Sequence, residues 1–205
     1  MPEGERPLLV LVSGPPCTGK TTLARRLAAH LGLPLMCKDT IKETLFEVLG
    51  VTDRAGSKRL GGASMEVLYT FVEAQLAAGQ GCVAEGNFDV TYSTPVFRRL
   101  MSLYPHTNVQ VNCFAEPAIL RARFRRRLLS GERHPGHQDH LPRDPSLDAP
   151  IPGRTPPLEI GGHVIELDTS DFARLDYEGL CAQIRRLYEP ETVCSNDLDR
   201  SGCQT

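Results

Sequence analysis

The fold is decided by LLVLVSGPPCTGKTTLARRLAAHLG, residues 8–32. Its first residues form a short apolar run before a glycine-rich turn, which predicts a buried strand. Further on, Leu23, Leu27 and Leu31 recur at steps of four, so they lie on one face of a predicted helix. Gly32 stands where such a helix ends. The stretch therefore predicts a strand, a loop and a helix in direct succession.

The loop between this strand and helix reads GPPCTGKTT and matches the phosphate-binding pattern G-x-x-x-x-G-K-[ST], the Walker A motif. Its two glycines permit a tight backbone path, Lys20 can reach the outer phosphates of a nucleotide, and Thr21 offers a hydroxyl to Mg²⁺. A glycine-rich turn with a surface lysine is the alternative. However, the flanking strand and helix are the setting in which backbone amides face phosphate. The predicted nucleotide-binding residues of this loop are Gly14, Pro15, Pro16, Cys17, Thr18, Gly19, Lys20, Thr21 and Thr22.

The rest of the chain alternates between strand-like and helix-like segments, which predicts an α/β fold with a parallel sheet covered on both faces. Ligands bind such sheets at the carboxyl ends of the strands. The weakly patterned piece at 50–62 is expected to be a loop. We expect strands at 8–12, 33–37, 81–84, 108–115 and 163–167, and helices at 19–31, 40–49, 63–78, 95–104, 117–130 and 175–188.

Two acidic residues follow predicted strands and are therefore expected at the ligand-binding edge of the sheet. Asp39, in CKDTIKE, is predicted to be a catalytic base that accepts the proton of an acceptor hydroxyl. Glu85, in CVAEGNF, is predicted to bind Mg²⁺ or substrate. The alternatives are that Asp39 caps the helix at 40–49 and that Glu85 is a solvated strand end. Lys42 and Asn87 are weaker candidates for contacting the acceptor, since both residue types are common on solvated surfaces.

The predicted helix at 117–130 is rich in arginine. Leu120, Phe124 and Leu128 form its expected buried stripe. Arg123 and Arg127 lie four residues apart beside that stripe and can clamp a triphosphate, because guanidinium groups match phosphate geometry. A solvated arginine face and a nucleic-acid-binding helix are the alternatives.

The segment at 131–157 is rich in Pro, Gly, His and Asp, and it is expected to be a lid that closes over the nucleotide and excludes water. Arg133 would add to the phosphate contacts. The histidines of this segment and Asp139 invite a metal-site hypothesis, which has less support because no cysteine cluster or second histidine pair is near in sequence. Residues 189–205 lack periodicity and are expected to be a disordered tail.

Composition narrows the class of protein. The chain has 205 residues, 40% hydrophobic and 23% charged, with a formal net charge of -2. It is therefore expected to form one globular domain over 1–188, and nothing in its overall charge calls for a polyanion partner. No apolar run is long enough for a membrane span, and the seven cysteines form no C-x-x-C pair. These features favour a cytoplasmic protein with free thiols.

The motifs together resemble the small P-loop kinases related to polynucleotide kinase domains and zeta toxins, AAA-type ATP-binding proteins that include antibiotic phosphotransferases. The resemblance rests on GPPCTGKTT, KDTIKE, EGNF, RARFRRR and GERHPGH, and spans roughly residues 8–188. It implies a five-stranded parallel sheet of order 2-3-1-4-5 with a lid. It also implies that Asp39 is the catalytic aspartate, Lys42 a substrate contact and Arg123 a lid-side arginine that faces the ATP phosphates. Two departures stand out, since Cys17 replaces a common glycine and Glu85 a frequent aspartate.

The expected function is an ATP-dependent kinase that uses Mg²⁺ and transfers the γ-phosphoryl group to a hydroxyl of a small molecule, such as a nucleoside, an antibiotic or a sugar-like acceptor. ATP is favoured over GTP because the chain lacks the Asn-Lys-x-Asp segment of guanine-specific proteins. A polynucleotide 5′-hydroxyl kinase and a non-catalytic ATP-binding regulator are the alternatives. Neither the acceptor nor the oligomeric state can be deduced from these motifs.

Overall fold

A five-stranded parallel sheet forms the centre of the protein. The computed structural model describes residues 6–51, 53–130, 134–137 and 151–188. In these residues the strand order is β2-β3-β1-β4-β5, which confirms the predicted α/β fold and its 2-3-1-4-5 sheet. The strands are β1 (Leu8–Ser13), β2 (Leu35–Cys37), β3 (Cys82–Glu85), β4 (Thr107–Phe114) and β5 (His163–Asp168).

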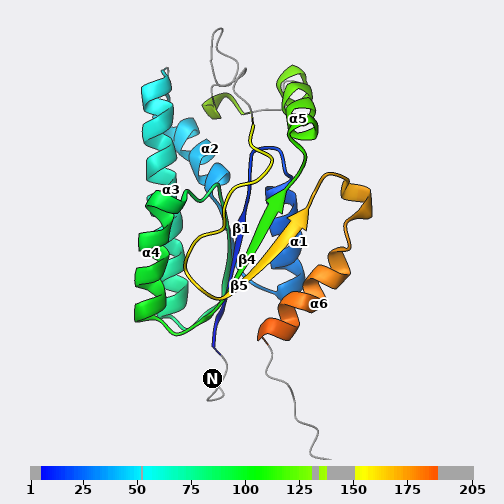
Figure 1. The fold of residues 1–205 in the computed structure, drawn as a ribbon. Coiled ribbons are helices and arrows are strands. Elements are labelled where there is room, and N and C mark those ends of the chain that lie inside the picture. The colour runs from blue at the N-terminus through cyan, green and yellow to red at the C-terminus, as the bar shows by residue number, and fades with distance from the viewer. Residues whose placement is uncertain (1–5, 52, 131–133, 138–150, 189–205) are drawn as a thin grey trace, which may run out of the picture.

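Helices cover both faces of the sheet. Figure 1 shows α1 and α6 on one side, α3 and α4 on the other, and α2 and α5 near the end to which the strand arrows point. The helices are α1 (Lys20–Leu31), α2 (Lys38–Leu49), α3 (Arg54–Ala77), α4 (Val90–Leu103), α5 (Pro117–Leu129) and α6 (Tyr177–Tyr188), with short 3₁₀ turns η1 (Pro135–His137) and η3 (Phe172–Arg174).

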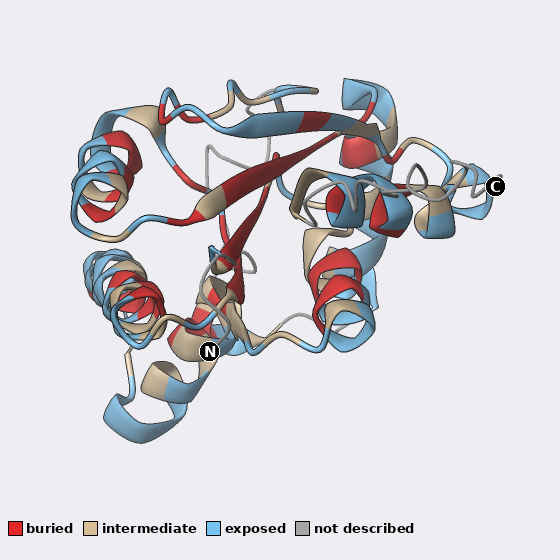
Figure 2. Cartoon of the chain, turned by 90° about the horizontal axis from the view of Figure 1, so that it is seen from below, coloured by how far each residue is buried: buried red, intermediate tan, exposed pale blue. Residues whose placement is uncertain are grey.

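The sheet separates two hydrophobic cores because successive side chains of a strand point to opposite faces. On β1, Val10 packs toward α1 and α6, whereas Leu9 and Leu11 pack toward α3 and α4. The burial pattern in Figure 2 agrees, since the central strands and the inward faces of the helices are buried and the outer faces of the helices are exposed. Burying one leucine side chain contributes about 2 kcal/mol, so these two layers are a main source of stability.

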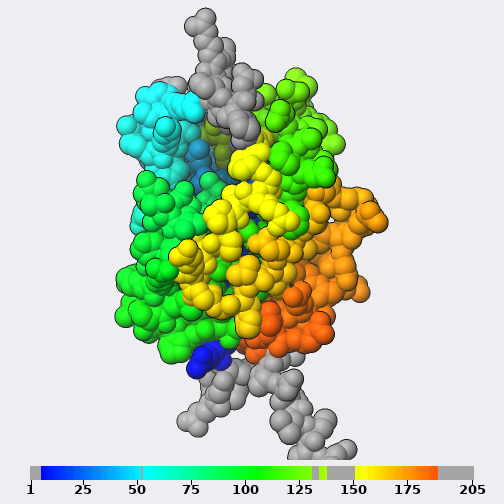
Figure 3. Space-filling view, viewed as in Figure 1, coloured from blue at the N-terminus to red at the C-terminus, as the bar shows by residue number. Residues whose placement is uncertain are grey.

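Extended chain covers part of the sheet face that packs against α3 and α4. This segment, residues 155–161, is here called the strap. Three amide side chains of β4 hold it. Asn112 donates to the Thr155 carbonyl at 2.8 Å and Asn108 to the Gly161 carbonyl at 3.0 Å. Between them, the Gln110 amide donates to the Leu158 carbonyl and accepts from its N–H. These bonds satisfy backbone groups that have no strand partner. The strap runs across the front of the molecule in Figure 3.

The helix α3 begins much earlier than expected. It starts at Arg54, so the prediction of a loop over 50–62 is wrong. Asp53 caps this helix, and its carboxylate accepts a hydrogen bond from the Gly56 N–H at 2.6 Å. The cap satisfies a free amide of the first turn and permits a glycine-containing stretch to be helical.

The helix α2 also begins earlier than expected, at Lys38 instead of residue 40. Its N-cap position is Cys37, so the prediction that Asp39 caps the helix is wrong. Asp39 lies in the first helical turn, and its carboxylate makes no capping bond there. The side chain is thus available to the cavity described below.

The helix α5 packs less tightly than its sequence pattern predicts. Of the three expected stripe residues, Leu120 is buried, but Phe124 and Leu128 are only half-buried. Figure 1 shows the reason, because α5 rises beyond the end of β4 and leaves the body of the sheet behind. Its later turns are therefore open to ligand or solvent.

Some expected features lie outside the described residues. They are Arg133, much of the lid expected at 131–157, and the tail expected at 189–205. Among the described residues, Cys17, Cys37, Cys82, Cys113 and Cys181 are free thiols, and no helix is long and apolar enough to cross a membrane.

Candidate active site

The loop from Gly14 to Gly19 has a backbone that only its particular residues adopt readily. Gly14 has φ +138°, and a Cβ there would lie 2.2 Å from the Cys113 carbonyl oxygen. Gly19 has φ +80° and forms the N-cap of α1. Both positions therefore require glycine. The loop leads directly into α1, whose first amides are free to bind an anion.

Cys17, which departs from the family pattern, has an unusual backbone conformation. Its φ is +66°, and it is the one residue other than glycine with positive φ in the described part of the chain. This left-handed conformation is the one that glycine adopts most easily, which fits the glycine common at this position. Cys17 is partly exposed and lines the cavity beside the loop.

Lys20 extends from the first turn of α1 back over the loop. Its Nζ donates to the Pro15 carbonyl at 2.8 Å, so the ammonium group lies inside the loop's curve. Burial lowers the pKa of Lys20, and the negative charge of Glu85 partly opposes that shift. A nearby phosphate would favour the charged form in the same way, because an opposite charge stabilises it.

Glu85 ends β3 at the floor of the cavity and is 3% exposed. Its Oε2 accepts a hydrogen bond from the Thr21 hydroxyl at 3.1 Å. Burial raises the pKa of Glu85, although the charge of Lys20 acts in the opposite direction. A carboxylate and a hydroxyl in contact are hard oxygen donors of the kind that Mg²⁺ binds. The residues present thus fit a magnesium ion.

Asp39 lies across the cavity from the loop, in the first turn of α2. Its Oδ1 accepts from Lys38 Nζ at 3.2 Å. Burial alone would raise the pKa of Asp39, but the charges of Lys38, His137 and Lys20 outweigh burial and hold the pKa below its usual value. Asp39 is therefore ionised at neutral pH and can accept a proton.

A second group of polar contacts forms the wall beyond Asp39. The buried Lys42 donates through Nζ to Ser57 Oγ at 2.9 Å, and that hydroxyl donates to the Gly136 carbonyl at 3.0 Å. His137 and Glu43 pair at 3.0 Å between Nε2 and Oε1. This wall joins α2, α3 and η1 at the end of the sheet.

One cavity of about 650 Å³ brings most of the predicted site residues together. The predicted residues that line it are Pro16, Cys17, Gly19, Lys20, Thr21, Thr22, Asp39, Lys42, Glu85, Asn87 and Arg127. The described residues that line it without having been predicted as site residues are Arg25, Lys38, Thr40, Glu43, Gly86, His134 and His137. Gly14, Pro15 and Thr18 belong to the loop but are not part of the cavity wall.

The two predicted clamp arginines are in different environments. Arg127 is exposed and lines the cavity. Arg123 is not part of the cavity wall. Its guanidinium donates to the carbonyls of Thr169 and Ser170 at 2.9 and 2.8 Å, and it lies 4.0 Å above the ring centre of Phe172. Its Nη1 donates to the Cys17 carbonyl of the phosphate loop at 3.5 Å, so Arg123 braces the turn after β5 against that loop.

Phe172 is a residue whose place beside the loop the sequence did not reveal. It is half-exposed, and a Cβ on Gly19 would lie 2.7 Å from its ring. The available signal was an aromatic residue just after the last strand, at the carboxyl edge of the sheet. Glu43 also carried a signal, because it lies one helical turn after Asp39 on the same face of α2.

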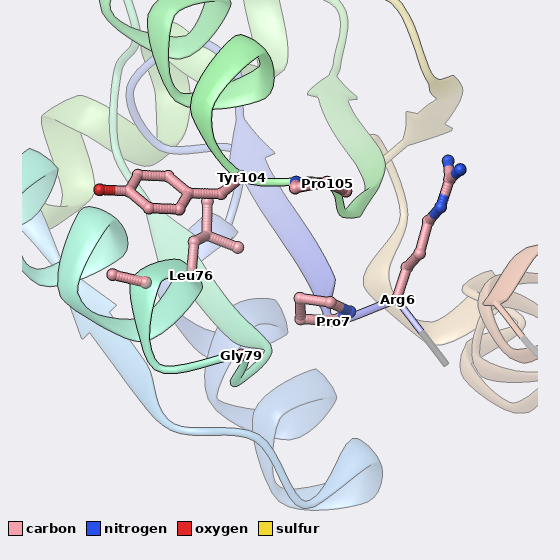
Figure 4. Close-up of a pocket in the computed structure, with 7 residues that line it drawn as sticks. Arg6, Pro7, Leu76, Gly79, Tyr104 and Pro105 are labelled. Carbon is pink, nitrogen blue, oxygen red and sulfur yellow. The ribbon is translucent and has the colours of Figure 1, made fainter. Parts of the chain in front are cut away.

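A second hollow, of about 470 Å³, lies at the opposite end of the sheet. Figure 4 shows Pro7, Leu76 and Pro105 around it, near the start of β1. It has no phosphate loop and none of the predicted site residues. Parallel sheets bind ligands at their carboxyl ends, so the 650 Å³ cavity is the candidate active site.

The histidine-rich segment gives no sign of a metal site where the structure describes it. His134 pairs with Glu47 and His137 with Glu43. No cluster of three or more potential metal ligands occurs among the described residues. Asp139 and His140 lie outside those residues.

The comparisons with known proteins agree with this architecture. Residues 9–142 match the AAA domain family, and the chain belongs to that family. A candidate kinase from Chloroflexus aurantiacus is 36% identical, with a TM-score of 0.84, over 90% of this chain and 100% of its own. The chain therefore has a kinase-like P-loop fold, as the resemblance of its motifs implied.

More distant structures share the fold alone. A sugar kinase from Janibacter sp. HTCC2649 is 18% identical with a TM-score of 0.50, over 90% of this chain and 94% of its own. A gluconokinase from Sinorhizobium meliloti 1021 is 14% identical with a TM-score of 0.52, over 90% and 95%. No curated protein sequence matches this chain.

Proposed function

We propose that this protein is an ATP-dependent kinase that transfers the γ-phosphoryl group to a hydroxyl of a small polar acceptor. The observation that carries the proposal is the meeting of three features in one cavity. These are the phosphate loop with Lys20, the buried pair of Thr21 and Glu85, and the ionised Asp39 opposite them. Phosphoryl transfer requires a phosphate cradle, a metal site and a group that accepts the acceptor's proton.

The loop and its basic residues bind the nucleotide. The amides at the start of α1 and the charge of Lys20 hold the outer phosphates, and Arg127 reaches them from α5. Arg123 keeps the turn after β5 seated, and Phe172 offers an aromatic face beside the loop on which a nucleobase can stack. Arg133 remains a proposed further phosphate contact.

Thr21 and Glu85 would hold the Mg²⁺ ion. When bound, this ion neutralises phosphate charge during transfer. Glu85 is well suited to the task because its carboxylate is buried and an adjacent cation favours the charged form.

Asp39 accepts the proton of the acceptor hydroxyl as that oxygen attacks the γ-phosphorus. Lys42 and Asn87 line the same side of the cavity and contact the acceptor's polar groups. No Phe or Tyr side chain lines this cavity among the described residues, which favours a sugar-like or other polyhydroxylated acceptor over a nucleobase-containing one. A polynucleotide acceptor is less favoured for the same reason. The named sugar kinase and gluconokinase share only the fold, so the choice of acceptor rests on the cavity.

The test is ADP release from Mg²⁺-ATP across sugars, aminoglycosides, nucleosides and oligonucleotides. We expect one polar acceptor class to stimulate release, and Asp39→Asn to reduce the stimulated rate by about 10²–10⁴-fold. Asp176→Asn is the matched control, because asparagine caps the start of α6 as well as aspartate does. Tight ATP binding without stimulated release by any acceptor would favour a non-catalytic regulator instead.

A further inference from the structure

Arg25 lines the candidate active site, although the sequence did not single it out. It lies one helical turn after Thr21 on α1, so the two side chains share a face of that helix. Thr21 contacts Glu85 at the end of β3, and this face is therefore turned toward the ends of β3 and its neighbour β2. Long side chains of a helix also slope back toward its start, which brings the Arg25 guanidinium toward the cavity.

The start of α2 lies at the same place. Cys37 at the end of β2 is paired in register with Glu85, and Lys38 is the next residue. The Lys38 side chain is 13% exposed, and a Cβ on Gly86 would lie 3.4 Å from its Cβ, so its stem packs against the residue that follows β3. Its ammonium group carries three donors, of which Asp39 accepts one at 3.2 Å. Lys38 can therefore also bind an anionic group beside the proposed base.

Arg25 makes no ion pair with a carboxylate among the described residues. The carboxylates that α2 brings into the cavity are already next to basic groups, since Asp39 accepts from Lys38 and Glu43 pairs with His137 at 3.0 Å. A guanidinium without a carboxylate partner is well suited to bind a carboxylate or a phosphate, because its planar donors match the geometry of both.

The acceptor side of the cavity, here the part lined by Arg25 and by residues of α2, carries an excess of positive formal charge. Its basic residues are Arg25, Lys38 and Lys42, and its acidic residues are Asp39 and Glu43. The phosphates of the nucleotide are proposed to bind at the loop, so this excess remains for the second substrate.

We propose that the acceptor carries a carboxylate or phosphate group besides the reacting hydroxyl, and that Arg25 binds this group together with Lys38. The inference rests on the proposed kinase function and makes Arg25 a residue that determines its specificity. A neutral polyol leaves the charge of Arg25 unmatched, and a cationic acceptor is repelled by it. The acceptors of this chemistry are acidic sugars and sugar phosphates.

Arg26 provides the matched control for Arg25. It is the next residue of α1 and is likewise exposed, but it does not line the cavity. Its guanidinium lies 4.4 Å above the ring centre of Tyr177 instead. A general effect of losing one positive charge from α1 will therefore occur in both variants, whereas the loss of an anion site will occur in one.

The test compares acceptors that differ by one charged group, with glucose, glucosamine, glucuronate and glucose 6-phosphate as one set and the galactose counterparts as another. ADP release from Mg²⁺-ATP is measured for each, and the carboxylate and phosphate members distinguish the two kinds of anion. We expect an acidic member to have a kcat/KM about tenfold or more above that of its neutral partner. Arg25→Gln should raise the KM for that acceptor about 10–100-fold and leave the KM for ATP unchanged, because charge-assisted hydrogen bonds are lost. Arg25→Lys should restore much of the difference, and Arg26→Gln should behave as the natural chain does.

Calorimetric binding of the same acceptors to the full chain loaded with Mg²⁺-ADP separates this inference from the proposed function. Tighter binding of an acidic sugar than of its neutral partner, lost in Arg25→Gln, would support the anion site even if no acceptor stimulated ADP release, a result that would count against the kinase function alone. Preferred transfer to a neutral or cationic acceptor would refute the present inference alone. It would also be overturned if no acidic member bound more tightly than its neutral partner, or if Arg25→Gln raised the KM for ATP.

Discussion

Glu85 is a buried carboxylate, and its effect on nucleotide binding depends on whether a metal ion is bound beside it. Its carboxylate is 3% exposed and contacts the Thr21 hydroxyl, in a cavity where phosphates would bring further negative charge. Without a metal ion, that carboxylate repels a bound triphosphate. With Mg²⁺, the same carboxylate becomes a ligand.

We therefore predict that Glu85→Gln reduces the gain in ATP affinity that Mg²⁺ provides by about tenfold. ATP binding without metal should be retained or improved, since a repelling charge is gone. Calorimetric titration with and without Mg²⁺ measures both. Glu43→Gln is the control, a carboxylate of the same cavity that is away from the loop. An equal loss of ATP affinity under both conditions would contradict a metal-binding role for Glu85.

The charge of Asp39 makes both the proposed activity and the stability of the protein depend on pH. Its pKa in the folded protein lies below the ordinary value of 3.8, because neighbouring cations outweigh burial. A lowered carboxyl pKa contributes stability above the unfolded value, and this contribution is lost as the pH falls through the folded value.

We predict that Asp39→Asn lowers the melting temperature at pH 7 and that the difference from the natural chain shrinks as the pH falls below the ordinary value of 3.8 and through the lower folded pKa. Thermal unfolding at several pH values measures this. A difference that stays constant from pH 7 to pH 3 would mean that the charge of Asp39 does not contribute.

At the scale of elements, the sequence pattern predicted those helices and strands that depend on interactions between residues close together in the chain. The β1–loop–α1 unit could be predicted because its strand, glycines and leucine stripe are contiguous. The alternation of β4 was also visible, since Val109 and Val111 face one core. The start of α3 was missed because residues 50–62 are only weakly patterned, which suggested a loop. Asp53 was the available signal, an acid three residues before the amide that it caps.

The position of residues 134–137 could not be predicted in the same way. Its partners Glu43 and Glu47 are 94 and 87 residues away in sequence, and nothing in either segment specifies the other. The strap over β4 could not be predicted for the same reason, because its contacts join residues that are far apart in the sequence. Asn108, Gln110 and Asn112 alternate with apolar residues, which is typical of a strand with a solvated face, yet they are buried and bind the strap.

The glycines of α3 allow a prediction about the stability of that helix. A Cβ on Gly61 or Gly62 would meet nothing within 4 Å, whereas a Cβ on Gly56 would lie 2.5 Å from Val51. We expect Gly61→Ala and Gly62→Ala each to raise the free energy of unfolding by about 0.5–1 kcal/mol, because alanine favours the helix. Gly56→Ala should lower it. Chemical denaturation measures the three values, and a gain at Gly56 equal to the others would contradict the packing described here.

At the scale of the whole molecule, the carboxyl ends of three parallel strands lie at one edge of the sheet. The loop follows β1, Asp39 follows β2, and Glu85 ends β3. These strands are neighbours in the order β2-β3-β1, so residues distant in sequence meet across a short span. The remaining wall comes from α2, from Arg127 of α5 and from the turn at 134–137.

This arrangement predicts how ligands change global stability. At 100 times its dissociation constant, Mg²⁺-ATP should stabilise the fold by about 2.7 kcal/mol. For a chain of this size, that corresponds to a rise in melting temperature of roughly 5–10 °C. Lys20→Ala should abolish the rise, and Asp39→Asn should retain it, because Asp39 lies on the acceptor side. Loss of the rise in both variants would mean that the two halves of the cavity are not separable.

The contacts that tie α2, α3 and the turn at 134–137 together have a consequence for the order in which the two substrates bind and leave. The phosphate loop continues directly from β1, a central strand whose hydrogen-bonded amides exchange with solvent only when the sheet itself opens. The turn at 134–137 is tied by a few side-chain bonds to surface helices, and it can detach at a much lower free energy. Hydrogen exchange should therefore be slow in β1 and fast at Gly136. A nucleotide can thus remain bound through many local openings, each of which admits or releases an acceptor.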